Sequence, residues 1–190
     1  MEIERAARTI REGGLVVYPT ETVYGLGADA LDPSAVKRVF EAKGRPHGKP
    51  LSMAVPDIET ASEYISLTTR EQAFIETFLP GPVTVLVKAG PEIPDELIAG
   101  GDRVGIRIPD HDLARSLLRE VAPITATSAN RSGNPSVRRP SELDPEIREV
   151  VGYIIDDGEL PGTESTVFDV EHEKIHRRGA LADEIEAWLS

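Results

Sequence analysis

The chain has 190 residues, of which 39% are hydrophobic and 28% charged, so it can bury an ordinary core without disulfide or metal support. Because it contains no cysteine, disulfides, a thiolate nucleophile and cysteine-ligated zinc are excluded. The formal net charge of −12 argues against binding nucleic acid over a large area, which requires a basic face, but it leaves room for a local basic cleft.

The N-terminus and the hydropathy of the chain favour a cytoplasmic protein with one domain over residues 1–190. Met1–Arg5 has no apolar run and starts acidic, so we expect neither a signal peptide nor a membrane anchor. No segment approaches the length of a membrane span. The most linker-like segment, Ser132–Pro140, follows a polar motif so closely that a functional loop is an equal interpretation.

Helical and strand patterns alternate along the N-terminal half of the chain. Gly13-Gly14 ends the first helical pattern, and Asp32-Pro33 offers the next helix an N-cap and a first-turn proline. In chain order we predict helix, strand, helix, strand, helix, helix and strand at residues 3–11, 15–18, 32–43, 51–55, 58–64, 70–78 and 83–88. The last strand alternates too little for an edge strand and is expected to be central.

The C-terminal half continues this alternation and ends in a hairpin and a helix. In chain order we predict strand, helix, strand, helix and strand at residues 104–108, 110–121, 124–127, 145–151 and 153–155. A hairpin of residues 166–170 and 174–177 follows, and then a terminal amphipathic helix at 181–189. Strands that alternate with helices predict an α/β fold, and the hairpin predicts a mixed sheet and not a purely parallel one.

Four side chains that can carry a positive charge lie within seven residues, Lys43-Gly44-Arg45-Pro46-His47-Gly48-Lys49, in an acidic chain. Two glycines and a proline keep this segment out of regular structure. Lysine and arginine repel each other at such spacing unless an anion lies between them, and both side chains suit phosphate. We interpret the segment as an anion cradle for a polyphosphate; on charge alone, a solvated basic loop is an equal alternative.

Two polar motifs each follow a predicted strand, where ligands bind in α/β proteins. The first offers the hydroxyls of Thr20 and Thr22, with Gly25 and Gly27 to permit close approach of a ligand. The second is Thr125-Ala126-Thr127-Ser128-Ala129-Asn130-Arg131-Ser132-Gly133, whose hydroxyl and amide groups suit hydrogen bonding to a polar ligand. Taken alone, a plain strand-to-turn segment explains the first motif, and a helix N-cap or an Asx turn explains the second.

Arg107 lies inside an apolar predicted strand, where an unpaired charge is costly. It either faces a polar cavity and holds an anion or forms a structural ion pair. His111 lies four residues later, near a helix start, and can reach the same cavity or serve as a helix cap. Ser165 and Arg177 flank the predicted hairpin and are further candidates for a polar pocket, although either can be a surface group.

One motif match is rejected on its context. His172-Glu173-Lys174-Ile175-His176 fits the H-E-x-x-H pattern of zinc proteases, which requires a helix that places both histidines on one face. The flanking residues predict strands, on which the two histidines would be roughly 13 Å apart, too far to share one zinc ion. We therefore expect a solvated hairpin here.

Several separated motifs, taken in order, resemble those of one family. They are Pro19-Thr20-Glu21-Thr22-Val23-Tyr24-Gly25-Leu26-Gly27, Lys43-x-Arg45-Pro46 with Lys49-Pro50-Leu51, Pro80-Gly81-Pro82-x-Thr84, Arg107-x-Pro109-x-His111, Ser128-Ala129-Asn130-x-Ser132-Gly133 and Ser165-Thr166-Val167. From Ile3 to Gly179 the chain resembles the YrdC-type threonylcarbamoyl-AMP synthases. The resemblance implies a twisted mixed β-sheet flanked by helices, with a large central cationic cavity.

The resemblance also implies a reaction. The enzyme would be a nucleotidyltransferase that converts L-threonine, bicarbonate or CO2 and ATP to threonylcarbamoyl-AMP and pyrophosphate. ATP with Mg2+ is implied as the cofactor, and a separate transferase that modifies tRNA is implied as the consumer of the product. We expect no stable binding of tRNA and no membrane association.

The resemblance gives a role to each matching polar residue. Lys43 and Arg45 would be the catalytic cations, offsetting charge as pyrophosphate leaves. The residues implied to bind ATP are Lys43, Arg45, Lys49, Arg107, Ser128, Asn130, Ser136 and Arg177. The residues implied to bind threonine are Thr20, His111, Ala126 and Ser165. No residue is implied as a metal ligand or a covalent nucleophile, because the nitrogen of threonine attacks CO2 and the carbamate oxygen then attacks the α-phosphorus.

Two departures from the family pattern leave questions open. Many members have Arg-Pro-Gly after the hairpin, whereas this chain has Arg177-Arg178-Gly179, so either arginine can be the one that meets the nucleotide. The chain also resembles a short form without the extra C-terminal domain of longer members. Another loop would then cover the site, or the site would stay more open.

Two other functions fit the same residues less well. A YrdC-like module that binds nucleotide or RNA without catalysis is one, but Lys43, Arg45, Ser128 and Asn130 are all present and the net charge of −12 disfavours RNA. Carbamoyl transfer, as in larger enzymes that contain a YrdC-like domain, is the other. Use of carbamoyl phosphate as a substrate would favour it.

Overall fold

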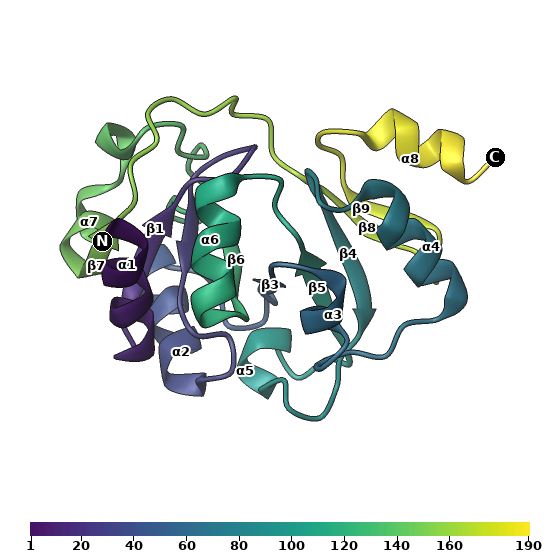
Figure 1. Ribbon diagram of the computed structural model, residues 1–190, viewed down its shortest axis with the longest axis horizontal. Coiled ribbons are helices and arrows are strands. Elements are labelled where there is room, and N and C mark those ends of the chain that lie inside the picture. The colour runs from purple at the N-terminus through teal and green to yellow at the C-terminus, as the bar shows by residue number, and fades with distance from the viewer.

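Nine strands form one sheet in the computed structural model, which describes residues 1–190 (Figure 1). Their order across the sheet is β7-β1-β2-β6-β3-β5-β4-β8-β9. Three neighbouring pairs are parallel, namely β1 with β7, β3 with β5 and β4 with β8, and the other five are antiparallel. The strands are β1 (Leu15–Tyr18), β2 (Gly25–Gly27), β3 (Ser52–Ala54), β4 (Val83–Lys88), β5 (Arg103–Arg107), β6 (Ile124–Ser128), β7 (Val151–Ile154), β8 (Thr166–Asp169) and β9 (Lys174–Arg177). The predicted mixed sheet is confirmed.

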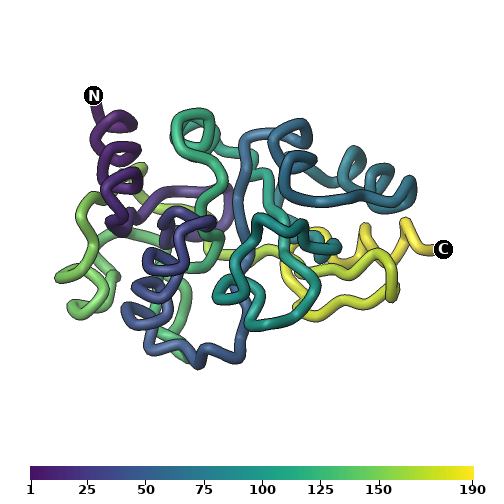
Figure 2. The backbone as a smooth tube through the Cα atoms, turned by 90° about the horizontal axis from the view of Figure 1, so that it is seen from below, coloured from purple at the N-terminus to yellow at the C-terminus, as the bar shows by residue number.

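Helices lie on both faces of this sheet, and the two chain termini lie at opposite ends of the molecule (Figures 1 and 2). None of the helices has the length and hydropathy needed to span a membrane. The α-helices are α1 (Glu2–Arg11), α2 (Pro33–Lys43), α3 (Ile58–Ala61), α4 (Thr69–Phe78), α5 (Asp95–Ile98), α6 (Asp112–Val121), α7 (Pro145–Val150) and α8 (Ala182–Trp188), and a 3-10 helix spans Pro140–Glu142.

The two faces of the sheet have separate hydrophobic cores, because successive side chains of a strand point to opposite faces. Leu15 and Val17 of β1 belong to the larger core, which includes residues of α2, α4, α5 and α8. Val16 and Tyr18 of the same strand belong to the smaller core, formed mainly with α1 and α6. The larger core therefore covers one face along the sheet, whereas α1 and α6 cover only part of the other face.

The central strands repeat this alternation in a way that creates a polar surface. Val83, Val85 and Val87 of β4 and Val104 and Ile106 of β5 all point into the larger core. The intervening residues of the same strands point to the other face, beyond the reach of the smaller core. A polar, partly open surface on the central strands results.

Most predicted elements are confirmed, including the central position of β4 and the hairpin β8–β9. Asp32 caps α2 by accepting a hydrogen bond from the Ser34 amide at 2.8 Å, and Gly44 ends the helix in the left-handed conformation with φ 55°. The rejection of a helix at His172–His176 is also confirmed, because His172 lies in the turn and His176 on β9.

Three short elements were missed, and three boundaries were wrong by two or more residues, while several others differ by one. Strand β2 escaped prediction because Gly-Leu-Gly has little strand propensity; it forms through pairing with β1 and β6. Helix α5 and the 3-10 helix are too short to show periodicity. The helix predicted over 58–64 stops at Ala61, the helix predicted from 110 begins at Asp112, and the strand predicted at 153–155 is β7, which begins at Val151.

A segment without regular structure, residues 155–165, joins β7 to β8 and is named the crossing segment here. Figure 1 shows it passing from the β7 side of the sheet to β8. The amide of Asp157 donates to the hydroxyl of Tyr24 at 2.9 Å, and the amide of Gly162 donates to the carbonyl of Thr22 at 2.8 Å. The amide of Leu160 donates to the carbonyl of Arg138 at 2.9 Å. These backbone contacts fix the segment beside the polar motif that follows β1.

Candidate active site

A cavity of about 320 Å³ lies on the uncovered part of the sheet. Its floor consists of every second residue of the central strands, as the alternation of side chains requires. These residues are Ser52 and Ala54 of β3, Thr84 and Leu86 of β4, and Arg103, Gly105 and Arg107 of β5. Most of them are small, and a Cβ at Gly105 would lie 2.9 Å from the methyl group of Thr84. Small side chains on this face therefore create the space.

Four arginines line the cavity: Arg45, Arg103, Arg107 and Arg177. The carboxylate in the lining is that of Glu164 alone. Burial lowers the pKa of Arg45 below its ordinary value, and the charge of Arg177 lowers it further. Burial also lowers the pKa of Arg177; Glu164 opposes this shift and Arg107 adds to it. The cavity thus holds incompletely solvated cations near one another, which a bound anion would stabilise.

Lys43 is buried and does not line the cavity, so its part in an anion cradle stays a prediction. Its Nζ donates to the carbonyl of Ser128, and to the carbonyl of Asn130 at 2.7 Å. Burial lowers its pKa to about 7, the charge of Arg45 acts in the same direction, and Glu164 opposes them. Lys43 therefore joins the end of α2 to the polar motif after β6.

Arg45 lines the cavity and is also anchored to its own loop. Its Nε donates to the carbonyl of Lys49 at 3.0 Å and its Nη2 to the carbonyl of Pro50 at 2.8 Å. A guanidinium has five N–H donors, so three of them stay free for a ligand. The Lys49 side chain is exposed and does not line the cavity.

The motif after β1 surrounds Arg107 at one end of the cavity. Thr20 and Thr22 share a hydroxyl–hydroxyl hydrogen bond of 2.8 Å. Arg107 Nη2 donates to Thr22 Oγ1 and to Glu21 Oε1, both at 2.9 Å. The two sequence alternatives for Arg107 are therefore both present: it lines the cavity and it forms an ion pair with Glu21. Arg107 Nε and Glu21 Oε2 are buried without a hydrogen-bond partner.

Ser165 and Arg177 meet in the cavity lining, together with Thr84. Arg177 Nη2 donates to Ser165 Oγ at 2.8 Å, and that hydroxyl lies 3.2 Å from Thr84 Oγ1. Arg178 points away from the cavity and binds Asp183 and Glu186 of α8. Of the two arginines that the sequence left open, Arg177 is thus the one that lines the cavity. His176 lines it too, although we expected the hairpin to be solvated there.

A second hollow, of about 450 Å³, lies beside the cavity and contains Asn130 and Ser136. Asn130 Nδ2 donates to the carbonyls of Arg131 and Asn134, and its Oδ1 is buried without a partner. Ser128 and Ala126 line the first cavity instead. Of the residues implied to bind ATP, four line the first cavity, Asn130 and Ser136 line the second hollow, and Lys43 and Lys49 line neither.

His111 lines neither hollow, and its predicted contact with threonine stays a prediction. It occupies the N-cap position of α6 without making a side-chain cap. Its Nε2 lies 3.1 Å from Asp157 Oδ2 of the crossing segment, and its Nδ1 is buried without a partner. The sequence could not show this contact because the crossing segment carries no periodic pattern.

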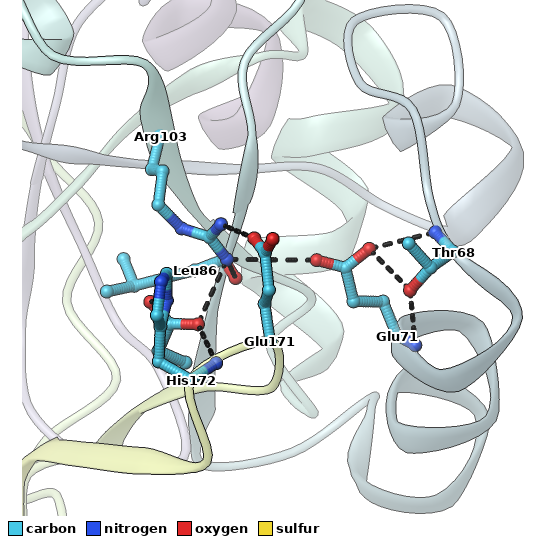
Figure 3. A network of polar contacts seen from close by, with 7 residues as sticks. Thr68, Glu71, Leu86, Arg103, Glu171 and His172 are labelled. Carbon is cyan, nitrogen blue, oxygen red and sulfur yellow. Dashed lines mark hydrogen bonds and ion pairs between the residues drawn. The ribbon is translucent and has the colours of Figure 1, made fainter.

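The end of the cavity opposite Arg107 is fixed by an ion network around Arg103 (Figure 3). Arg103 donates to Asp169 Oδ1 at 3.0 Å, to the carbonyl of Leu86 at 2.9 Å and to Glu171. It also lies 3.8 Å from Glu71, whose carboxylate accepts the amide of Thr68 at 2.8 Å. The network joins β4, β5, β8 and α4, and sequence reasoning missed it.

The chain belongs to the Sua5/YciO/YrdC family. The family model Sua5_yciO_yrdC, described as "Telomere recombination", matches residues 8–179. A protein of Methanocaldococcus jannaschii is 38% identical over 174 residues, which cover 91% of this chain and 82% of that protein. The threonylcarbamoyl-AMP synthase of Pyrococcus abyssi is 43% identical over 173 residues, covering 89% of this chain and 51% of the synthase. The resemblance drawn from the motifs is confirmed.

A solved structure of Pyrococcus abyssi Sua5 complexed with L-threonine has the same fold. It matches with a TM-score of 0.89 and 40% identity, over 97% of this chain and 56% of that one. The expected YrdC-like fold is therefore confirmed. This chain spans about half the length of the Pyrococcus abyssi proteins and 82% of the Methanocaldococcus jannaschii protein.

Replacing Arg103 by methionine is expected to destabilise the fold strongly. The change leaves the buried carboxylates of Glu71 and Asp169 without their shared cation, which typically costs about 3–5 kcal/mol. Urea unfolding of wild type and variant measures the decrease in the free energy of unfolding. The matched control is Arg11→Met, which breaks the half-exposed pair with Glu120 and should cost at most about 1 kcal/mol. Equal costs for the two variants would contradict the role assigned to the network.

Proposed function

We propose that this chain is an L-threonylcarbamoyl-AMP synthase and therefore a nucleotidyltransferase. It would join L-threonine, bicarbonate or CO2 and ATP to give threonylcarbamoyl-AMP and pyrophosphate, for the threonylcarbamoyladenosine modification of tRNA. The observation that carries the proposal is a cavity with four arginines in its lining, in a chain 43% identical to a threonylcarbamoyl-AMP synthase. We further propose that residues 1–190 act as one YrdC-like domain in the cytoplasm, where ATP and tRNA are available.

The reaction needs positioning and charge stabilisation more than a protein nucleophile. The nitrogen of threonine attacks CO2, the carbamate oxygen attacks the α-phosphorus of ATP, and pyrophosphate leaves. Negative charge accumulates on the phosphates during the second step, so preorganised cations are the main contribution the protein can make. Arg45, which pairs with no carboxylate, and Arg177 beside Glu164 can supply such charge, whereas Arg103 and Arg107 are already paired with carboxylates.

Lys43 and Arg45 are proposed to bind the triphosphate, with Lys49 assisting after a movement of its loop. A neutral lysine amine has two N–H groups, and both would be used on the carbonyls of Ser128 and Asn130. Protonation adds a third N–H, which can be directed at a phosphate oxygen. Arg45 keeps three free donors beside it.

Threonine is proposed to bind at the Arg107 end of the cavity. Arg107 can share its guanidinium between Glu21 and the substrate carboxylate, because its Nε has no partner in the ligand-free state. Thr20, Ala126 and Ser165 line the same cavity and would contact the rest of the substrate. His111 would join them only if its contact with Asp157 opens.

The nucleotide is proposed to lie across both hollows. Ser128 and Arg177 are on the side of the first cavity, and Asn130 and Ser136 are on the side of the second. The unpartnered Oδ1 of Asn130 is a free acceptor for a nucleotide donor. Arg107 would then lie at the junction of threonine and nucleotide.

Mg2+ is proposed to enter with the ATP phosphates. The chain has no group of three or more potential metal ligands, and the cavity lining has one carboxylate, that of Glu164. Mg2+ commonly uses phosphate oxygens and water with one or two carboxylates, so this donor set fits an ion carried by the nucleotide. Bound there, it would neutralise phosphate charge.

The test of the proposed function is an assay over amino acids. With ATP, Mg2+ and bicarbonate, pyrophosphate should be released with threonine and not with the other amino acids, and mass spectrometry should detect threonylcarbamoyl-AMP. Binding of ATP without pyrophosphate release from any amino acid would favour a non-catalytic binding module, which a gel shift with tRNA would examine further. Turnover of carbamoyl phosphate would favour carbamoyl transfer.

The Arg45→Ala variant is expected to lose roughly 100-fold or more in turnover while its fold stays intact, because a preorganised cation at the departing phosphates is removed. Pyrophosphate release and circular dichroism measure the two properties. Arg8→Ala is the control, since Arg8 is exposed on α1 and far from the cavity lining. Near-normal turnover of Arg45→Ala would refute the triphosphate assignment.

ATP binding at pH 8 is expected to take up about one proton. The pKa of Lys43 is lowered to about 7 in the ligand-free chain, so its amine is mostly neutral at pH 8, and a neighbouring triphosphate raises that pKa again. Calorimetric titrations in two buffers of different ionisation enthalpy measure the uptake. The proton uptake should vanish at pH 6, where Lys43 is already charged, and in the Lys43→Met variant. Equal heats in both buffers at pH 8 would exclude Lys43 as the phosphate contact.

A further inference from the structure

Glu164 lies where the two hollows meet. It is the last residue but one of the crossing segment, and its carboxylate lines the first cavity. Its Oε1 accepts a hydrogen bond from the hydroxyl of Ser136, which lines the second hollow. Its Oε2 lies 3.4 Å from Nη1 of Arg177, which lines the first. One carboxylate thus joins a residue of each hollow.

The partners of Glu164 are groups that a phosphate would also use. A serine hydroxyl and an arginine guanidinium are common donors to phosphate oxygens, and a carboxylate is the side chain that most resembles such an anion. The charge of Glu164 opposes the lowering of the pKa of both Lys43 and Arg177. The carboxylate therefore supplies negative charge that stabilises these two cations.

The position of this carboxylate is set by the backbone. The carbonyl of Glu164 accepts the amide of Ala180 at 2.9 Å, and the crossing segment is held at Gly162 by the carbonyl of Thr22. The side chain itself is 37% exposed, so it can turn to solvent without moving the segment. A change of rotamer is enough to release Ser136 and Arg177.

We propose that Glu164 is an internal competitor of the ATP triphosphate: it holds Ser136 and Arg177 until the nucleotide displaces it and spans both hollows. The inference rests on the proposed function and deepens it. Glu164 would then lower the affinity for the nucleotide by holding two of the residues that bind it. A triphosphate is repelled by the charge of Glu164 and competes with it for Ser136 and Arg177. Adenosine carries no phosphate and therefore does not compete with Glu164.

The decisive experiment compares wild type with Glu164→Gln and Glu159→Gln by calorimetric titration without Mg2+. The ligands are ATP, inorganic triphosphate and adenosine. Gln keeps the shape of Glu164 and removes the charge, so ATP and inorganic triphosphate should bind about five- to tenfold more tightly, with adenosine unchanged. Glu159 is on the same segment and lines neither hollow, but it pairs with Arg138, which lines the second. Glu159→Gln therefore controls for the loss of one negative charge near the hollows, and a gain equal to that of Glu164→Gln would overturn the proposal.

The outcomes separate this proposal from the proposed function. Unchanged or weaker binding of triphosphate to Glu164→Gln would overturn the competitor role, while ATP binding by the wild type would leave the synthase proposal intact. Failure of the wild type to bind ATP would count against the synthase, and the inorganic triphosphate titration would still decide the role of Glu164. If Glu164→Gln fails to unfold cooperatively, Glu164→Ala takes its place with the same expected gain. The titration is repeated with Mg2+ present. If Glu164→Gln binds ATP more weakly than wild type only when Mg2+ is present, Glu164 is a metal ligand and the proposal is overturned.

Discussion

The alternation of side chains along the strands is the constraint on which the site depends. Because one face of the sheet is packed along its length under α2, α4, α5 and α8, the apolar residues at every second position are committed to that core. The intervening positions are then free of the core where α1 and α6 do not reach. Gly105, Ser52 and Thr84 leave space there, and Arg103 and Arg107 bring charge to its two ends. Core and cavity are therefore two sides of the same strands.

The second organising feature is the way in which each cation is held before a ligand arrives. Lys43 and Arg45 donate to main-chain carbonyls, whereas Arg107 and Arg177 have a carboxylate neighbour each. These contacts fix the positions of the cations but use only part of their hydrogen-bonding capacity. Removal from water lowers the pKa values of Lys43, Arg45 and Arg177, and a neighbouring arginine lowers each of them further.

Local sequence patterns were sufficient for most of the fold and for part of the site. Leu15–Tyr18 and Val83–Lys88 are apolar enough to predict buried strands, and Gly44 predicts the end of α2. The family motifs brought Thr20, Arg107 and Ser165 to one predicted pocket, and all three line the cavity, whereas the choice between Arg177 and Arg178 needed the structure. What the sequence could not show are contacts between distant segments. The carbonyls that bind Lys43 come from residues 128 and 130, and the carboxylate beside His111 comes from residue 157. The sequence shows which side chains can carry a charge, but tertiary packing decides which group each of them contacts.

Adjacent arginines at the end of β9 connect the cavity to the outer surface of the molecule. Arg177 binds Ser165 inside the cavity, whereas Arg178 binds Asp183 and Glu186 of α8 on the outside. Trp188 of the same helix packs edge-on against Phe74, with 5.1 Å between ring centroids, so α8 is fixed at both ends. Arg177 in the cavity and Arg178 on the surface of α8 are joined by a single peptide bond, so the cavity lining and the C-terminal helix share one stretch of backbone.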